Sequence, residues 1–507
     1  MRQIFPWAVV AVVVGIAAPA HADKASGTLH LAADQPVSSV SYYYDPSPDT
    51  VFESDAVYDG LVSYDVKSGT VEPLLAKAWR RIDPQTLEFD LRDDVKWQDG
   101  TPFTAADVAY TLNFLSDPKT VLRFKGNWSW IDKVEQLGDD KIRIHAARPT
   151  PYDLTRFAYV TTILPAHQPG TPQEKAYHPI GTGPYRATQV NDATGLVFER
   201  NPDFNHGNPA KPGSNIARIT MQPVPEEGTR VAQLLAGNLD MIDTSLEQAQ
   251  NLAQDPRFEL SIVQGASFMY VAYDARGRSG AKPVTDIRVR QALTMAIDRA
   301  ALMKLVAGDA KIDPPGAMCW RSQAGCDYSA PLPAYDPAGA KKLLADAGYP
   351  NGFDIEITTF TGAPTQVAEA VAGQWHAIGV NAKIDALAVV SYRKKQEAGK
   401  IQVMAAAWPG GNIPDVSATV DAFFAAGPAD YSGDQQLHDL AAQSDGTMDP
   451  ATRKAIGRKM FDRATEQFYF LPLAPSPTIL VHTKELAVTQ SSRFTPLGYE
   501  VSDLNWR

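Results

Sequence analysis

The stretch from Pro350 to Ile384, PNGFDIEITTFTGAPTQVAEAVAGQWHAIGVNAKI, decides the fold class because its apolar residues change period twice. Ile355 and Ile357 follow a Pro-Asn-Gly turn at the spacing of a strand. Between Val367 and Trp375 apolar residues recur every four positions, as on one face of a helix, and Gly379 ends that pattern. After Gly379 the apolar residues alternate again, up to Ile384, at the spacing of a strand. The order strand, helix, strand predicts a βαβ unit with parallel strands.

The same signals occur on both sides of this unit. Alternating apolar residues over 87–91 predict a half-buried strand, and Thr104 followed by Asp107 predicts a capped helix start. Asp336 before a proline predicts another helix start, and we expect one long helix over 287–306. Strand and helix signals thus alternate along the chain, which predicts an α/β fold.

The composition is that of an ordinary globular protein. The 507 residues include 44% apolar and 21% charged residues, so disorder, collagen-like repeats and a disulfide-stapled miniprotein are excluded. The length predicts two to three domains. The net charge of −11, with no basic run longer than the three residues Arg393–Lys395, argues against nucleic-acid binding.

The first 22 residues have the pattern of an export signal. Arg2 supplies a positive charge, the stretch from Ile4 to Ala20 carries no charge, and Ala20-His21-Ala22 fits a signal peptidase site. An uncleaved membrane anchor is the poorer alternative, because the stretch is short and contains prolines. We therefore expect cleavage after Ala22 and a mature chain in the periplasm.

Cys319 and Cys326 are the only cysteines of the chain, seven positions apart. Export permits a disulfide, so a local bond between them is expected. A metal site is the alternative, but no second Cys or His pair stands nearby.

Motifs of common catalytic sites are missing from the sequence. There is no G-x-S-x-G, H-E-x-x-H or P-loop pattern, and no pair of histidines stands at i,i+4. The Gly-rich segment from Gly181 to Tyr185, which contains Thr182 and Gly183, is better explained as a turn entering a strand than as a phosphate loop. We therefore expect that the protein binds no cofactor and that it is not an enzyme.

Aromatic residues gather where loops follow strands. Tyr42, Tyr43 and Tyr44 stand after the first strand-like segment, and Trp128-Ser-Trp130 forms a second group. Trp408 ends an apolar run and precedes Pro409-Gly410-Gly411. Such rings suit a ligand cleft, although core packing is the ordinary role of a single ring.

Ordered motifs occur along most of the chain. The early ones are Val57–Val62, Pro73–Ala76, Phe89–Arg92 and Trp97–Val108. The later ones are Pro179–Tyr185, Arg200–Phe204, Asp286–Leu293, Ala296–Arg299, Tyr335–Pro337 and Ala347–Pro350. In this order the motifs resemble those of the family 5 extracellular solute-binding proteins, the oligopeptide, dipeptide and nickel receptors of ABC importers.

The resemblance implies a periplasmic-binding-protein fold of class II, cluster C, with two lobes joined by a hinge and an inserted extra domain. Lobe I would comprise residues 23–56, 180–275 and 482–507, the inserted domain 57–179, and lobe II 276–481. The lobes would close on a ligand and present a surface to permease subunits of the transporter.

The resemblance also places the ligand site. Peptide-binding members hold the peptide amino terminus with an aspartate on the loop after a tryptophan that corresponds to Trp408, and here Gly410 stands at that position. Asp415 matches a later acidic position, where it would either face ligand or cap the next helix. The arginine of the dipeptide receptors has no counterpart between Thr358 and Gln366.

These observations lead to a monomeric receptor that binds a small solute, with peptides as the default class. A sugar, an opine or other modified amino acid, and a metal chelate remain alternatives, as does a secreted hydrolase. The expected ligand-binding residues are Tyr43, Tyr44, Thr182, Gly183, Trp408, Gly410 and Asp415.

Overall fold

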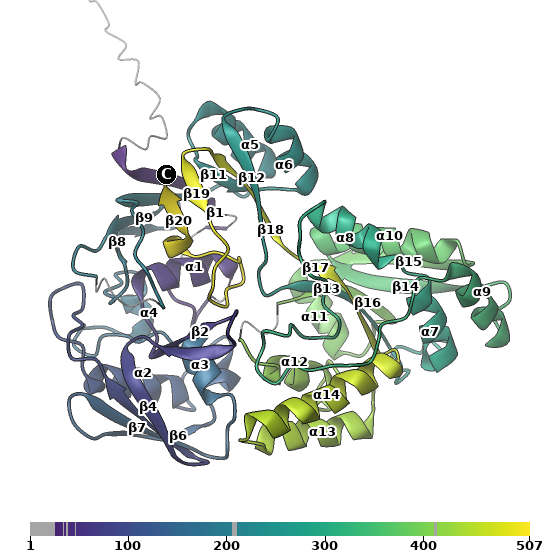
Figure 1. The fold of residues 1–507 in the computed structure, drawn as a ribbon, viewed down its shortest axis with the longest axis horizontal. Coiled ribbons are helices and arrows are strands. Elements are labelled where there is room, and N and C mark those ends of the chain that lie inside the picture. The colour runs from purple at the N-terminus through teal and green to yellow at the C-terminus, as the bar shows by residue number, and fades with distance from the viewer. Residues whose placement is uncertain (1–25, 34, 37–38, 46, 205–209, 410–412) are drawn as a thin grey trace, which may run out of the picture.

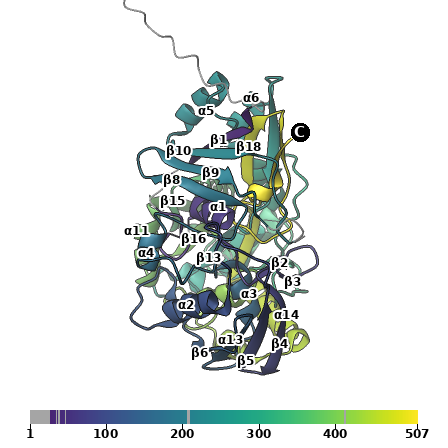
Figure 2. The same ribbon diagram turned by 90° about the vertical axis from the view of Figure 1, so that its left-hand side faces the viewer.

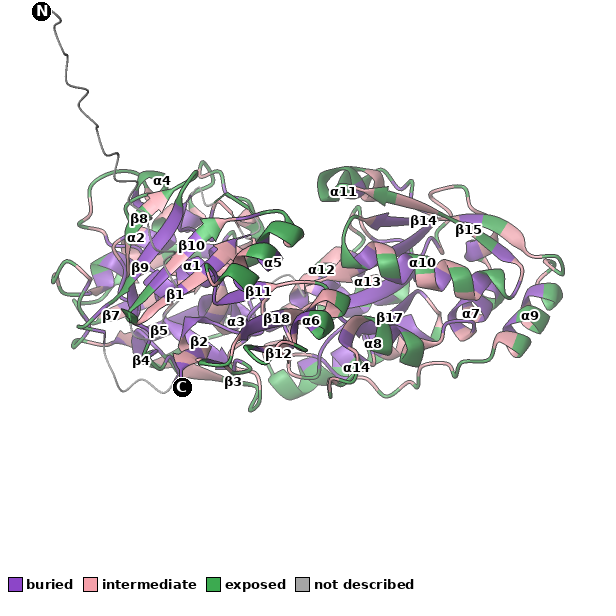
Figure 3. Ribbon diagram, turned by 90° about the horizontal axis from the view of Figure 1, so that it is seen from above, coloured by how far each residue is buried: buried purple, intermediate pink, exposed green. Residues whose placement is uncertain are grey.

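The computed structural model describes residues 26–33, 35–36, 39–45, 47–204, 210–409 and 413–507. The predicted export signal and Gly410 lie outside the described residues. No helix in the described ranges is long and apolar enough to cross a membrane. Figures 1 and 3 show two bodies side by side, joined near the middle of the molecule.

The first body, which we call lobe I, is built on a seven-stranded sheet. Its order is β12 (Phe258–Val263), β18 (Thr478–Thr483), β11 (Met241–Asp243), β1 (Thr28–Ala33), β10 (Arg218–Pro223), β9 (Gly195–Arg200) and β8 (Tyr185–Asn191). The central strand β1 runs parallel to β10 and β11, and the remaining pairs are antiparallel. Its helices are α1 (Pro48–Val57), α5 (Glu227–Ala236) and α6 (Leu246–Leu252).

The second body, lobe II, is built on a five-stranded sheet. Its order is β15 (Val380–Leu387), β14 (Phe353–Phe360), β16 (Val403–Trp408), β13 (Phe268–Tyr273) and β17 (Phe470–Pro475). Its helices are α7 (Ile287–Met295), α8 (Arg299–Ala307), α9 (Pro337–Asp346), α10 (Ala363–His376), α11 (Val389–Glu397), α12 (Ser417–Phe423), α13 (Gln435–Gly446) and α14 (Pro450–Glu466). Successive residues of β13 point to opposite faces: Phe268 packs in one buried cluster and Met269 in the other.

Residues 57–179, the predicted inserted domain, carry a four-stranded antiparallel sheet and a short hairpin. The sheet order is β4 (Ala76–Asp83), β5 (Thr86–Leu91), β7 (Lys141–Ala146) and β6 (Ile131–Gln136), and the hairpin is β2 (Val62–Asp65) with β3 (Thr70–Pro73). Its helices are α2 (Ala105–Ser116), α3 (Asp153–Tyr159) and α4 (Pro172–Lys175). Figures 1 and 2 place this domain at the same end of the molecule as α13 and α14.

Several predicted elements are confirmed. β14 and β15 are parallel and α10 connects them, as the βαβ pattern requires. Thr104 is the N-cap of α2 with a capping box, and the Asp336 carboxylate accepts from the Gly339 N–H at 2.8 Å at the start of α9. The single helix expected over 287–306 is wrong. The structure has two helices, because Asp298 caps α8 by accepting from the Ala301 N–H at 3.0 Å.

The two lobes are connected by two crossing segments, which we call the crossings. The first, residues 264–267, joins β12 to β13, and the second is the dipeptide Ser476-Pro477 between β17 and β18. The predicted boundaries between the lobes are residues 276 and 482. The chain passes from the sheet of lobe I to the sheet of lobe II about ten residues before 276, and it returns about five residues before 482. The Ser476 N–H donates to the Ser267 carbonyl at 3.0 Å, so the crossings contact each other.

The C-terminal segment packs on the first crossing. A short ladder of β19 (Leu486–Val488) and β20 (Leu504–Trp506) holds its ends. Gln490 accepts from the Gln264 N–H at 2.7 Å and donates to the Gln264 carbonyl at 2.9 Å. A Cβ on Gly265 would lie 1.9 Å from the Pro496 carbonyl oxygen, so only glycine fits there.

Candidate functional site

A cavity of about 750 Å³ lies between lobe I and lobe II. We call it the interlobe cavity. Lobe I contributes the carboxyl ends of β1 and β11 and the first turn of α1, and lobe II contributes the end of α8 and the start of α10. The second crossing forms part of the wall. Ligands of open α/β sheets bind in crevices at the carboxyl ends of strands, and this cavity has that position.

Local sequence explains why these elements meet here. α1 starts at the cavity because Ser47 is its N-cap, accepting from the Thr50 N–H at 3.3 Å, and Pro48 follows at the first helical position. α10 starts at the cavity because Gly362, with φ 108°, makes the sharp turn after β14. No side chain caps α10, and Gly362, Ala363 and Gln366 line the cavity.

Most of the remaining wall is apolar. The larger apolar lining residues are Leu31, Phe52, Met221, Met241, Ile242, Leu246, Met269, Leu305, Val306, Pro477, Ile479, Leu480, Leu497 and Tyr499, and the smaller ones are Ala32, Pro48 and Ala363. Leu305 is 42% exposed, so part of its side chain is accessible to solvent. An apolar wall with a few polar groups is the usual composition of a ligand site.

The charged residues that line the cavity all come from lobe I: Asp49, Glu227, Arg230 and Asp243. The Glu227 carboxylate accepts from the Thr244 hydroxyl at 2.5 Å and the Ser245 N–H at 2.8 Å. These hydrogen bonds lower the pKa of Glu227. The Arg230 guanidinium donates to the Val224 and Pro225 carbonyls and lies 3.4 Å from Asp243.

Trp408 stands at the end of β16, on the sheet edge where Gly362 follows β14, but it is not among the cavity-lining residues. Its ring is half-buried, with its centroid 4.9 Å from that of Phe423. Its Nε1–H donates to the Thr419 hydroxyl at 2.9 Å. In this structure the tryptophan therefore packs on α12.

Tyr43 and Tyr44 differ in their surroundings. The Tyr43 ring is 1% exposed and packs edge-on against Trp128, and its hydroxyl donates to the Thr162 carbonyl. Tyr44 is half-buried beside the same core. The structure thus places Tyr43 in the core, because its ring and hydroxyl are both already engaged, and leaves part of Tyr44 accessible.

Thr182 and Gly183 lie where the inserted domain returns to lobe I. The Thr182 hydroxyl donates to Asp59 at 2.7 Å, and the buried Lys211 ammonium donates to the same carboxylate at 2.8 Å. A Cβ on Gly183 would lie 2.7 Å from the carbonyl carbon of Val57. These residues hold α1 against the domain boundary, as the turn interpretation of the Gly-rich segment expects.

Asp415 is fully buried, and its carboxylate is bound by the guanidinium of Arg453 on α14 at 2.6 and 2.7 Å. It also accepts from the Ser417 N–H at 2.7 Å, at the start of α12. Of the two roles expected for Asp415, this geometry shows the helix-start contact. The ion pair with α14 was not foreseen, because 38 residues separate the partners.

The sulfur atoms of Cys319 and Cys326 are bonded to each other. No cluster of His, Cys, Asp and Glu suited to a metal ion occurs in the part of the chain that the structure describes. The pairing therefore leaves neither cysteine as a free thiol ligand.

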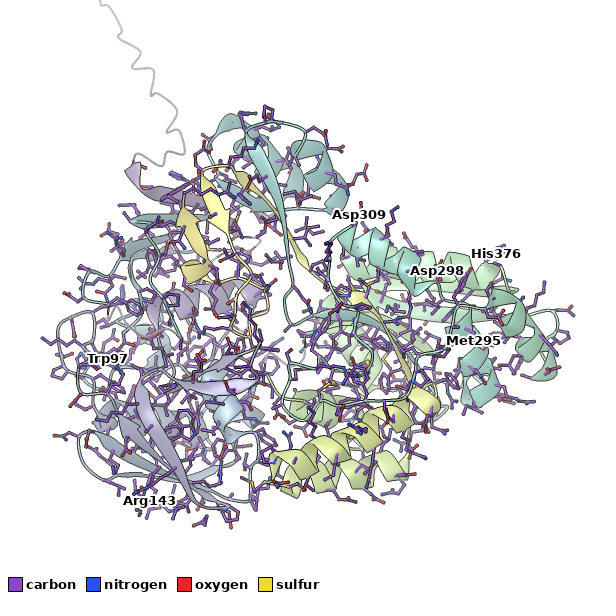
Figure 4. The ribbon with its side chains drawn as sticks, viewed as in Figure 1. Trp97, Arg143, Met295, Asp298, Asp309 and His376 are labelled. Atoms are coloured by element: carbon purple, nitrogen blue, oxygen red, sulfur yellow. A yellow bond between two sulfur atoms is a disulfide. The ribbon has the colours of Figure 1, made fainter. Side chains whose placement is uncertain are left out.

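Among the other hollows of the described structure, one lies on lobe II and one lies between lobe II and the inserted domain. One, of about 630 Å³, is on the outer side of lobe II next to His376, which Figure 4 shows far from the junction of the lobes. The other, of about 360 Å³, lies between Arg148 of the inserted domain and His438 and Asp445 of α13. Burial and the nearby charge of Asp421 raise the pKa of Asp445 to about 6. We call this second hollow the interdomain groove.

The chain matches the bacterial extracellular solute-binding proteins, family 5 Middle, over residues 70–431. It is 28% identical over 467 residues to the glutathione-binding protein GsiB of Shigella dysenteriae, covering 88% of each chain. It is 28% identical over 398 residues to heme-binding protein A of Haemophilus influenzae, covering 71% of this chain and 70% of that protein.

The fold is also found among solved structures. The crystal structure of NikA from Brucella suis in complex with Fe(III)-EDTA superposes with a TM-score of 0.81 at 22% identity. The match covers 95% of this chain and 100% of that one. It confirms the predicted α/β architecture of the periplasmic-binding-protein type.

Proposed function

The chain belongs to family 5 of the bacterial extracellular solute-binding proteins, the substrate-binding proteins of ABC importers, and we propose that it captures a peptide-sized solute in the interlobe cavity. Like its relatives, which are solute-binding proteins, it is a receptor and not an enzyme. The observation that carries the site is the cavity itself, which both lobes line at the carboxyl ends of strands and which the second crossing borders.

A volume of about 750 Å³ lies within the range of ~300–1,000 Å³ that is typical of ligand pockets. Among the relatives, GsiB is named for glutathione, a small peptide, and heme-binding protein A for heme. A peptide remains the proposed class for this chain, since the walls offer apolar surface together with a few charged groups.

The remaining parts of the proposal concern residues and location. We keep Trp408 and Tyr44 as proposed ligand contacts although neither lines the cavity in this structure. Trp408 ends a strand on the sheet edge from which α10 begins, and Tyr44 stays partly accessible. Tyr43, Thr182, Gly183 and Asp415 would support the cleft from behind. Export through the N-terminal signal would place the receptor, as a monomer, in the periplasm beside its permease.

One substitution tests the site. Ala363→Trp puts a large ring at the first position of α10, inside the cavity, and should weaken binding of any captured solute at least tenfold. Glu369→Trp is the matched control, because Glu369 is an exposed residue of the same helix outside the cavity lining.

Native mass spectrometry of the purified protein would identify the solute, and isothermal titration calorimetry would measure its affinity for both variants. Unchanged affinity in Ala363→Trp would contradict the proposed site. Conversion of the solute into a product would contradict the receptor function.

A further inference from the structure

The apolar lining of the interlobe cavity indicates which part of a solute the cavity recognises. We infer that the cavity binds a bulky apolar group of the solute, such as the side chain of a leucyl, phenylalanyl or tryptophanyl unit, and that three methionines let it accept such groups of different size. This inference rests on the proposed function and specifies the ligand of the same site.

The charged groups of the lining already have partners inside the protein. The Glu227 carboxylate accepts from a hydroxyl and from a backbone N–H. The Arg230 guanidinium donates to two carbonyls and lies 3.4 Å from Asp243. Asp49 also has a partner of its own. A charged group of the solute would have to compete with these contacts, so the main gain on binding must come from the burial of apolar surface.

Two methionines and a leucine form one row across the sheet of lobe I. Leu31 on β1 stands in register with Met221 on the parallel strand β10 and with Met241 on the parallel strand β11. In-register residues of parallel strands point to the same face of a sheet, and all three residues line the cavity. We call them the Met–Leu–Met row. The row gives lobe I a continuous apolar surface at the cavity.

A third methionine lines the cavity from lobe II. Met269 lies on β13, in the sheet of the other lobe (Figure 1), so both lobes contribute thioether side chains. Three of the ten methionines of the chain thus gather around one cavity. A methionine side chain is unbranched and flexible, so it adapts to the shape of a bound group, and its sulfur contacts aromatic rings favourably. Met-rich surfaces are for this reason typical of proteins that bind several partners.

Stiffer apolar side chains complete the wall. The ring centroids of Phe52 and Tyr499 lie 5.7 Å apart, with the rings tilted by 58°. Leu305 and Val306 line the cavity at the end of α8, and part of Leu305 is exposed. A solute that covers Leu305 removes apolar surface from water on both molecules, which favours binding. The stiff side chains therefore favour an apolar group, and the flexible methionines allow its size to vary.

Four peptides with the same termini test the inference by titration calorimetry at pH 7. They are tripeptides with glycine at both ends and leucine, phenylalanine, tryptophan or glutamine in the middle, where glutamine supplies a polar side chain of similar size to leucine. We expect the three apolar peptides to bind at least tenfold more tightly than the glutamine peptide and within fivefold of one another. Equal binding of the glutamine and leucine peptides would overturn the inference, and so would absence of binding by the apolar peptides at millimolar concentration.

Variants connect the tolerance for size to the methionines. The double variant Met221→Leu with Met241→Leu keeps the row apolar and nearly constant in volume, but it replaces two flexible side chains by branched ones. The ratio of the affinities for the leucine and tryptophan peptides should then change at least fivefold. Met460→Leu is the matched control, because Met460 is a buried methionine of α14 outside the cavity lining, and it should leave the ratio unchanged. An unchanged ratio in the double variant would overturn the assignment to the methionines.

Nuclear magnetic resonance of isotope-labelled methionine methyl groups locates the bound side chain directly. The phenylalanine peptide should shift the methyl signals of Met221 and Met241, because the bound ring would lie against them, and should leave that of Met460 in place. The Met→Leu variants assign these signals. Unchanged signals of both cavity methionines at saturating peptide would overturn the inference.

The cavity-blocking variant separates this inference from the proposed function. If Ala363→Trp loses the solute that copurifies with the parent protein, while the glutamine peptide binds as tightly as the leucine peptide, the site stands and the ligand class is wrong. If Ala363→Trp binds the phenylalanine peptide as the parent protein does, the proposed site itself is wrong. Circular dichroism melting of each variant ensures that the comparison is made between folded proteins.

Discussion

Asp415→Asn separates a structural role of this residue from a binding role. In the structure Asp415 is fully buried and Arg453 is 4% exposed, and two hydrogen bonds of 2.6 and 2.7 Å join them. The substitution keeps an oxygen that can accept from the Ser417 N–H, but it leaves the guanidinium without its counter-charge. Breaking a buried pair in this way costs about 3–5 kcal/mol.

The structure favours the lower end of this range for the loss of unfolding free energy in Asp415→Asn. The charge of Asp445 also acts on Arg453, so it compensates part of the loss, and we expect a value near 3 kcal/mol. For a domain of this size, ~2–4 °C per kcal/mol corresponds to a fall in melting temperature of roughly 6–12 °C. Asp94→Asn is a control, because it removes a carboxylate with a 59% exposed side chain from an ion pair and should cost less than ~1 kcal/mol.

Urea unfolding followed by circular dichroism measures these differences. The double variant Asp415→Asn with Arg453→Met should recover most of the loss, because it no longer buries an unpaired charge. Ligand affinity at a temperature where the single variant is folded should change less than threefold. Near-normal stability combined with loss of binding would refute this reasoning and would assign Asp415 to the ligand.

Trp408→Ala should weaken solute binding at least tenfold and also lower the free energy of unfolding by ~1–3 kcal/mol, since the ring packs on Phe423; calorimetry showing unchanged affinity would restrict the ring to packing. The raised pKa of Asp445, about 6, makes the folded protein hold this proton more tightly than the unfolded chain does. Its contribution to stability is thus complete below about pH 4 and is lost as the pH rises through 6. Asp445→Asn should flatten that part of the stability profile and raise stability at pH 7 by ~1–3 kcal/mol; an unchanged profile from urea unfolding at each pH would contradict this. Reduction of the bond between Cys319 and Cys326 should cost roughly 2–3 kcal/mol, measured by melting with and without dithiothreitol, because it closes a short loop; equal melting temperatures would contradict it.

The sequence was sufficient for elements whose signals are local. The spacing from Val367 to Trp375 predicts α10, and Asp336 predicts the start of α9, because periodicity and capping depend on neighbouring residues. The split between α7 and α8 could also have been found locally. Asp298 has the side chain of an N-cap, but the apolar residues on both sides suggested one continuous helix.

The cavity could not be predicted in the same way. Asp49, Glu227, Asp243 and Gln366 come from four segments that only the sheet topology brings together.

The Gly-rich segment from Gly181 to Tyr185 shows another role that sequence alone does not predict. Thr182 and Gly183 were expected to contact ligand, and their position at a turn was expected too. The structure gives the reason for the glycine, which is the close approach of the Val57 backbone. Sequence alone could not distinguish a backbone that approaches a ligand from one that approaches another strand or helix.

The packing of the C-terminal segment on the first crossing has a consequence for kinetics. Opening of the lobes requires rotation of backbone dihedrals at the crossings, and Gln490 is bonded to both polar groups of the Gln264 backbone there. Those bonds must move with the strand or break, so the last residues of the chain contribute to the activation barrier for opening. The lifetime of the loaded receptor, and thus the time available to find a permease, would be set in part by this C-terminal segment, whose Leu497 and Tyr499 also line the interlobe cavity.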